Sequence, residues 1–283
     1  MVQSNCEMYA DDTKVYDTVN TQSKRVELQQ DLDNLVEWAE IWQLRFNAEK
    51  CQVLHLGRTN PRYTYSMKAH GSETRSNLGA SDAEKDLGVI MDSELKFSKH
   101  IETQVGKANK ILGLIRRSYD YLNAETMRLL FIALIRPHLE FANVVWSPRF
   151  QKDKNLIEGV LRRATKLVPG MKDLQYSDRL VKMRIPSMQY RRERGDMIEV
   201  YKLCNGKYKI KEIPLQFEER SVTRGHSLKL KKTRCNTSLR QHFFAYRVVD
   251  NWNNLPEDVV TAPSLEAFKR RLDITWASKS SEY

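Results

Sequence analysis

The chain of 283 residues has little cysteine and no long hydrophobic run. Its four cysteines lie far apart, without a CxxC pair or a histidine at zinc-knuckle spacing, so we expect reduced thiols and no zinc site. The six histidines form no close pair either. No stretch approaches the roughly 20 apolar residues that a membrane span needs, and the N-terminus has no signal-peptide pattern. We therefore expect no membrane partner and a nuclear or cytoplasmic rather than secreted location.

Charge is distributed unevenly over the chain, whose net charge is +11. Residues 1–94 contain 10 Lys or Arg and 16 Asp or Glu, whereas residues 95–283 contain 37 and 20. The basic part has the electrostatic character of a surface that binds a polyanion. A solvated basic surface is the alternative interpretation, but the recurrence of basic clusters on predicted helices favours nucleic acid.

Hydrophobic periodicity predicts an α+β fold. Residues 1–94 combine short strands with one long helix whose apolar positions run from Val26 to Trp42, and they form a small antiparallel sheet with that helix. From Ser98 onward the pattern is mainly helical. Composition and breaks predict three domains: 1–94, a helical domain at 95–168, and a basic, mainly helical domain at 169–283, which begins at Pro169–Gly170.

Several local predictions can be compared with the structure. Val15–Val19 and Leu87–Met91 are predicted strands, the latter a buried strand or a hairpin arm. Pro137 should kink or end a helix that begins near Asn123. His226–Thr233 alternates leucines and lysines as a half-exposed strand does, and Gln241–Trp252 is expected to form one helix.

The tetrapeptide Tyr9-Ala10-Asp11-Asp12 is the strongest candidate for chemistry. Two adjacent acids at the tip of a β-hairpin can offer hard oxygen ligands to Mg²⁺, and paired Mg²⁺ ions serve phosphoryl transfer. Adjacent aspartates at a turn are more often solvated turn formers, so the tetrapeptide alone is weak evidence.

Further motifs strengthen this interpretation. In order and spacing, the chain resembles the later palm motifs of reverse transcriptases from non-LTR retrotransposons, in particular jockey-like LINE elements. The palm-like motifs are Tyr9–Asp12, Trp42–Cys51 and Lys85–Val89. Motifs that look like the thumb and C-terminal region of the same proteins follow at Arg136–Ala142, Arg162–Lys166, Thr223–His226 and Trp252–Pro256.

The resemblance implies roles for individual residues. Asp11 and Asp12 match the acidic pair that binds catalytic Mg²⁺, and Tyr9 matches an aromatic residue that packs against the template-primer backbone. Lys50 matches a lysine thought to protonate the departing pyrophosphate, although a surface lysine capping a turn is an equal alternative. Leu87, Gly88 and Val89 match a hairpin that grips the primer, and they would otherwise be ordinary strand residues.

Residues 95–168 match the thumb, which holds the duplex through phosphate contacts. The resemblance and the predicted helix faces give a set of basic candidates for nucleic-acid binding. They are Lys107, Lys110, Arg116, Arg117, Arg162, Arg163 and Lys166.

The resemblance implies the C-terminal part of an RNA-directed DNA polymerase, with an RNA template and a DNA primer, or an RNA–DNA hybrid, as partners. A complete palm also needs an earlier strand with another metal-binding aspartate and a fingers subdomain, so we expect weak Mg²⁺ binding and no activity of the chain alone. Deoxynucleotides would bind only if those parts were supplied. The alternatives are a non-catalytic RNA- or DNA-binding module and a non-functional remnant of the element.

Overall fold

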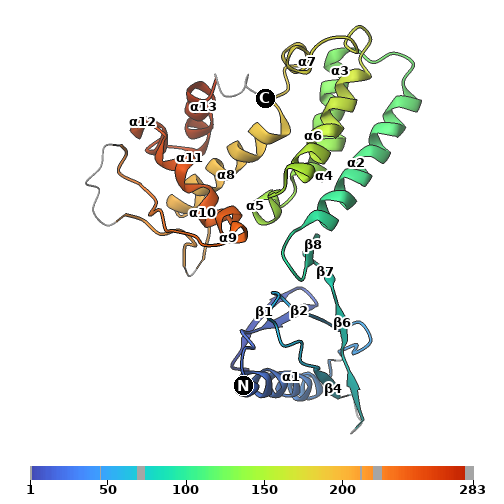
Figure 1. Cartoon of the computed structure of the whole chain (residues 1–283), viewed down its shortest axis with the longest axis vertical. Helices are drawn as coiled ribbons and strands as arrows, with labels where there is room; N and C mark the ends of the chain where they lie inside the picture. Colours follow the sequence, from blue (N-terminus) through green and yellow to red (C-terminus); the bar gives the residue numbers. More distant parts are fainter. Residues whose placement is uncertain (1, 45, 69–73, 211, 219–224, 278–283) are drawn as a thin grey trace. The chain divides into compact units, whose positions relative to one another are not determined.

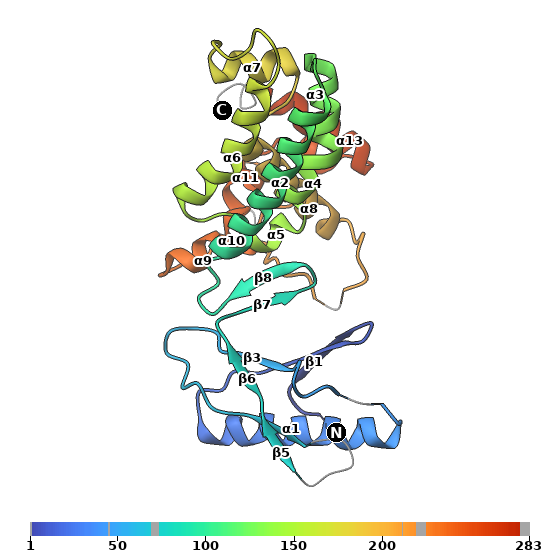
Figure 2. The ribbon, with the colours of Figure 1, turned by 90° about the vertical axis from the view of Figure 1, so that its right-hand side faces the viewer.

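The computed structural model describes residues 2–44, 46–68, 74–210, 212–218 and 225–277. Arg45, Thr223 and Arg224 of the motifs above lie outside these ranges. The chain divides into two compact units, Met1–Leu95 and Lys96–Tyr283. Figures 1 and 2 show the elements of both units.

The N-terminal unit combines one long helix with short strands that pair two by two. β1 (Asn5–Tyr9) and β2 (Asp12–Tyr16) form an antiparallel hairpin, and α1 spans Gln22–Ile41. The other strands are β3 (Gln52–Leu54) parallel to β6 (Gly79–Ser81), β4 (Ser66–Lys68) antiparallel to β5 (Arg75–Asn77), and β7 (Ala83–Asp86) antiparallel to β8 (Val89–Asp92).

Two strand predictions were shifted along the sequence. The return strand begins at Asp12 instead of Val15, because only Ala10 and Asp11 form the loop. The apolar run from Leu87 to Met91 begins in a turn: Leu87 and Gly88 join β7 to β8, and both have positive φ. Two positive φ angles suit the tight turns that match the twist of a hairpin.

α1 packs on β4 to form the core of this unit. Val36 is buried with Tyr65 and Met67, as the apolar face of the predicted helix requires. Gln29 adds a polar connection: its side chain donates to Ser66 O (2.8 Å) and accepts from Ser66 N (3.0 Å). The helix therefore satisfies backbone groups of a short strand that its neighbours leave unpaired.

The C-terminal unit is mainly helical, which confirms the α+β class predicted from periodicity. Its helical segments are α2 (Ser98–Ser118), α3 (Ala124–Leu130), the π-helix η1 (Phe131–Ile135), α4 (Arg136–Glu140), α5 (Asn143–Trp146), α6 (Gln151–Lys166), α7 (Tyr176–Met183), α8 (Met188–Cys204), α9 (Ser238–His242), α10 (Phe244–Arg247), α11 (Val249–Asn253), α12 (Glu257–Val260) and α13 (Leu265–Thr275). None of the helices in the described ranges is long and apolar enough to cross a bilayer.

The helical pattern predicted from Ser98 onward is confirmed by α2, whose apolar stripe of Ile101, Val105, Ala108, Leu112 and Ile115 is buried, and this helix packs against α6 and α4. A second part of the core gathers α8 and α10–α13 around Trp252, which is fully buried. There Tyr201 stacks on Phe268 with ring centroids 4.4 Å apart, and its hydroxyl donates to Ala262 O at 2.7 Å.

The structure departs from three local predictions for this unit, among them that Pro137 kinks or ends its helix. The helix does not end at Pro137: the π-turn of η1 lets Arg136 N donate to Phe131 O, five residues back, and α4 continues to Glu140. His226–Thr233 is no strand, because only Leu230 forms an isolated bridge, with Phe217. Gln241–Trp252 is divided among α9, α10 and α11, since Phe243 has extended backbone angles.

Candidate catalytic hairpin and nucleic-acid interface

The acidic pair lies at the tip of the β1–β2 hairpin. Tyr9 pairs with Asp12 across the ladder, and Ala10 at the first loop position has φ 54°. This backbone conformation is uncommon for an L residue with a Cβ. Asp11 and Asp12 are exposed, and Tyr9 is 68% exposed, so the tip presents two carboxylates and an aromatic ring to solvent.

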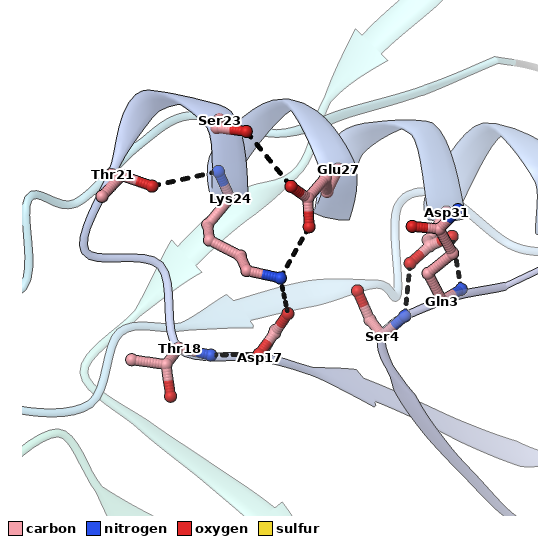
Figure 3. Close-up of polar contacts among 9 residues, drawn as sticks. All are labelled: Gln3, Ser4, Asp17, Thr18, Thr21, Ser23, Lys24, Glu27 and Asp31. Carbon is pink, nitrogen blue, oxygen red and sulfur yellow. Dashed lines mark hydrogen bonds and ion pairs between the residues drawn. The ribbon is translucent and has the colours of Figure 1, made fainter.

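Both ends of the hairpin are attached to α1 (Figure 3). Before β1, Gln3 N and Ser4 N donate to the two carboxylate oxygens of Asp31, at 2.9 and 2.6 Å. After β2, Asp17 forms an ion pair with Lys24, which also forms one with Glu27. These contacts connect both ends of the hairpin to the helix that contributes Val36 to the core of the unit.

Asp31 is a site residue that the sequence analysis missed. It is only 2% exposed. Burial raises the pKa of its carboxyl, but hydrogen bonds from Ser4 and Gln3 outweigh that effect and hold the pKa below its usual value. The available signal was its position: Asp31 lies between Leu28 and Leu32, on the apolar face of the helix, where an unpaired carboxylate would be costly.

An ion pair brings a second candidate motif beside the acidic hairpin. Lys14 in β2 donates to Asp86 at 2.8 Å and lies 3.6 Å from Glu7. The hydrogen bond to Asp86 raises the pKa of Lys14. Asp86 is the last residue of β7, directly before the Leu87–Gly88 turn. The structure thus places these two hairpins, widely separated in sequence, side by side within one unit.

The Leu87–Gly88 turn is exposed. Leu87 has φ 44° and is 55% exposed, and Gly88 has φ 90°. A left-handed backbone conformation costs free energy for leucine, and an exposed side chain gains little packing energy to offset that cost. Leu87 is therefore a candidate functional position. Val89, by contrast, is 4% exposed and belongs to the core.

Lys50 caps a turn through its backbone. Its N–H donates to Asn47 O at 3.0 Å, and the side chain of Asn47 accepts from Glu49 N at 3.1 Å. The side chain of Lys50 is exposed and makes no hydrogen bond or ion pair with a described residue. The structure therefore shows how the turn forms and leaves the ammonium accessible.

The donor set at the hairpin is incomplete for Mg²⁺, which prefers near-octahedral oxygen coordination. Asp11 and Asp12 supply two carboxylates, and no group of three or more His, Cys, Asp or Glu residues that could hold a metal occurs in the ranges the structure describes. The described residues alone do not fit a catalytic magnesium ion.

The predicted basic residues of α2 and α6 differ in their surroundings. Arg163 donates to Asn109 on α2 at 2.9 and 3.2 Å, and Arg162 lies over the Tyr176 ring at 4.2 Å. The other five are exposed and have no hydrogen-bond or ion-pair partner among the described residues. They are Lys107, Lys110, Arg116, Arg117 and Lys166.

The arginines of α8 are mostly structural. Arg191 forms a bidentate pair with Glu140, Arg194 forms one with Asp273, and Arg192 is 4% exposed. Asp196 on the same helix accepts two bonds from Arg247, at 2.8 and 2.9 Å. The high charge of this helix therefore contributes less to an outer basic surface than its sequence suggests.

Part of the chain is similar in sequence to an RNA-directed DNA polymerase of a mobile element. Over 99 residues, 33% of the chain, it is 39% identical to the RNA-directed DNA polymerase from mobile element jockey of Drosophila melanogaster, 10% of which is covered. Over 131 residues, 45% of the chain, it is 23% identical to an uncharacterized protein of Caenorhabditis elegans, 66% of which is covered. The chain thus spans less than two thirds of either relative. No protein-family model and no solved structure matches. The chain therefore contains a region similar to a retrotransposon reverse transcriptase.

Proposed function

We propose that this chain is the C-terminal part of an RNA-directed DNA polymerase of the non-LTR retrotransposon type. In this proposal, Asp11 and Asp12 form one edge of the polymerase site, and Tyr9 and the Leu87–Gly88 turn contact the primer-template. Lys50 acts on the leaving pyrophosphate, and the exposed basic residues of α2 and α6 hold the phosphates of an RNA–DNA hybrid.

The ion pair between Lys14 and Asp86 is the observation that carries this proposal. It places a turn with two exposed carboxylates beside a turn with an exposed, strained leucine, in a chain partly similar to a polymerase. Two adjacent loops of this kind suit a primer end, because one loop can position the strand while the other presents negative charge for cations.

The described residues are expected not to catalyse polymerisation alone. Two carboxylates without a further ligand bind Mg²⁺ weakly, since the ion gives up its water reluctantly. The test is primer extension by the 283-residue chain on an RNA template with Mg²⁺ and deoxynucleotides. No incorporation is expected; robust incorporation that is lost in the Asp11→Asn, Asp12→Asn double variant would contradict the expected inactivity of the chain alone, while robust incorporation that the double variant retains would contradict the proposed role of the two aspartates.

Metal binding is tested separately with Mn²⁺, followed by electron paramagnetic resonance. We expect a dissociation constant on the order of 1 mM, and loss of binding in the Asp11→Asn, Asp12→Asn variant. A Glu102→Gln, Glu125→Gln variant is the matched control, because it removes two acids from the C-terminal unit. Equal loss in both variants would show nonspecific ion binding.

A non-catalytic nucleic-acid-binding module is the second candidate function. It is favoured by the five exposed cations of α2 and α6 that have no partner among the described residues. Binding of an RNA–DNA hybrid should weaken steeply with added salt, and Lys107→Ala with Lys110→Ala should reduce the salt slope. Hybrid binding without any incorporation, even when a complete polymerase palm is supplied, would favour this candidate over the first.

A further inference from the structure

A basic segment of the C-terminal unit, which we define as Lys229–Arg240, runs into the first turn of α9 (in orange, leading to the label α9, in Figure 1). From Gly225 to His242 the sequence has five Lys or Arg and no Asp or Glu. Lys231, Lys232, Arg234 and Arg240 are exposed. The segment thus concentrates positive charge on a part of the surface for which the polymerase proposal gives no role.

The backbone before and at the start of this segment is fixed by side chains of α11. Trp252 Nε1 donates to Leu228 O at 2.8 Å. Asn253 holds Leu230 from both sides, accepting from its N–H and donating to its carbonyl, each at 2.8 Å. Leu230 is 1% exposed, so the hydrophobic residue lies inward while Lys231 points to solvent. These bonds reduce the backbone entropy that Leu228 and Leu230 would lose when a ligand binds beside them.

Neighbouring acids neutralise only part of this charge. Lys232 pairs with Asp250 at 2.7 Å, and Glu218 is adjacent because its N–H donates to Lys229 O. Lys231 and Arg234 have no side-chain hydrogen bond or ion pair with any described residue. These two cations are therefore available to an external anion.

Aromatic rings lie at the other end of the segment. Arg240 donates to the Tyr246 hydroxyl at 2.8 and 3.0 Å, and its guanidinium lies 5.2 Å from that ring's centroid. Phe243, between α9 and α10, is 58% exposed. Gln241 donates to Cys235 O at 3.2 Å, which holds α9 against the end of the basic run. Exposed cations and an exposed aromatic ring thus occur within one short stretch of the chain.

We propose that the basic segment is a binding surface for single-stranded nucleic acid, separate from the duplex-binding face of α2 and α6. Lys231 and Arg234 contact successive phosphates, and Phe243 stacks on a base. Phosphate contacts and base stacking tolerate any sequence, so binding should show little base preference. The surface is formed by this segment alone, and its binding does not require the chain to come from a polymerase.

The test measures binding of the 283-residue chain to a fluorescein-labelled 20-nucleotide single-stranded RNA, by fluorescence anisotropy at several salt concentrations. Lys231→Ala with Arg234→Ala should weaken binding about 10-fold and reduce the slope of log K against log salt by about 1.4, since each single-strand phosphate contact contributes about 0.7. Phe243→Ala should weaken it about 5-fold or more, with an unchanged slope.

The matched control is Lys172→Ala with Lys182→Ala, which removes two exposed lysines of the same unit. If this control loses as much affinity as the double variant, the segment has no special role and the proposal is overturned. If Lys231→Ala with Arg234→Ala abolishes binding to vesicles with 30% phosphatidylserine but leaves RNA binding unchanged, the segment binds membranes. That result would also overturn the proposal. Lys107→Ala with Lys110→Ala should weaken binding of the RNA–DNA hybrid and leave binding of single-stranded RNA unchanged. A failure of the duplex-binding proposal is therefore distinguishable from a failure of the single-strand proposal.

Discussion

Lys14 Nζ lies 2.8 Å from Asp86 Oδ2, so one ion pair connects the strand that follows the acidic turn to the residue that precedes the Leu87–Gly88 turn. Both side chains are partly exposed. The pair therefore orients two loops more than it stabilises the fold, because screened ion pairs at a surface contribute little free energy.

A double-mutant cycle on this pair tests its strength. We expect Lys14→Met and Asp86→Asn to show a coupling of about 0.5 kcal/mol in urea unfolding at low salt, and almost none at 1 M salt. Glu7→Gln is the control, since Glu7 lies farther from Lys14, at 3.6 Å. Coupling that is insensitive to salt would contradict the assignment of the pair to the surface.

Asp31 should be essential to the stability of the N-terminal unit. Asp31→Ala leaves Gln3 N and Ser4 N without their acceptors, and we expect a loss of about 2 kcal/mol in the free energy of unfolding. Asp33→Ala, which removes a more exposed acid of the same helix paired with Arg75, should cost less.

The pH dependence of the wild type gives a second measurement on Asp31. Because its folded pKa lies below the unfolded value, its stabilising effect is present above the unfolded pKa and is lost as pH falls through the folded pKa. A wild-type unit whose acid sensitivity equals that of Asp31→Ala would contradict this prediction.

His100 predicts a different pH dependence for the C-terminal unit. It is 1% exposed, with its ring 5.1 Å from that of Trp146, and burial, helped by the charge of Lys107, lowers its pKa to about 4. The unfolded state binds the proton more readily, so stability should be fully present above about pH 6.5 and should fall by about 3 kcal/mol on going down to pH 4. His100→Leu should remove this slope in urea unfolding.

Asp196 is buried, and its partner Arg247 is largely shielded from solvent, so breaking this pair costs more than breaking a surface ion pair. Burial raises the pKa of Asp196 although Arg247 donates two hydrogen bonds to it. Arg247→Met should therefore destabilise the unit by about 3 to 5 kcal/mol, because a carboxylate remains buried without its partner. Adding Asp196→Leu should restore most of the loss, and thermal unfolding of the three variants measures both effects.

Periodicity predicted the parts of the fold that depend on burial. The stripe of α2 and the hairpin of the acidic pair follow from spacing alone. The alternation at His226–Thr233 is real, but it produces only one bridge, to Phe217, and the side chains of Trp252 and Asn253 bind much of the remaining backbone, which no periodicity encodes. Interactions between distant side chains, such as that of Lys14 with Asp86, are equally invisible to local pattern.

The candidate site was predictable as a set of residues but not as an arrangement. The roles of Asp11, Asp12 and Lys50 remain predictions, since a resemblance supplies them and geometry alone does not test them. The partners of the arginines of α8 were likewise not predictable from the sequence. Arg191 and Arg194 pair with acids 51 and 79 residues away, and such partners become visible only when the helices pack.

The π-turn at Phe131–Ile135 has a consequence for the helix that follows it. A π-turn accommodates one more residue than an α-turn, and each residue of a helix advances the side-chain direction by about 100°. The extra residue therefore sets the direction in which Glu140 leaves α4, toward Arg191 on α8. Deleting a single residue between 131 and 135 would turn Glu140 away by about a quarter of a circle, so that a change of length in one helix would break a contact made by another.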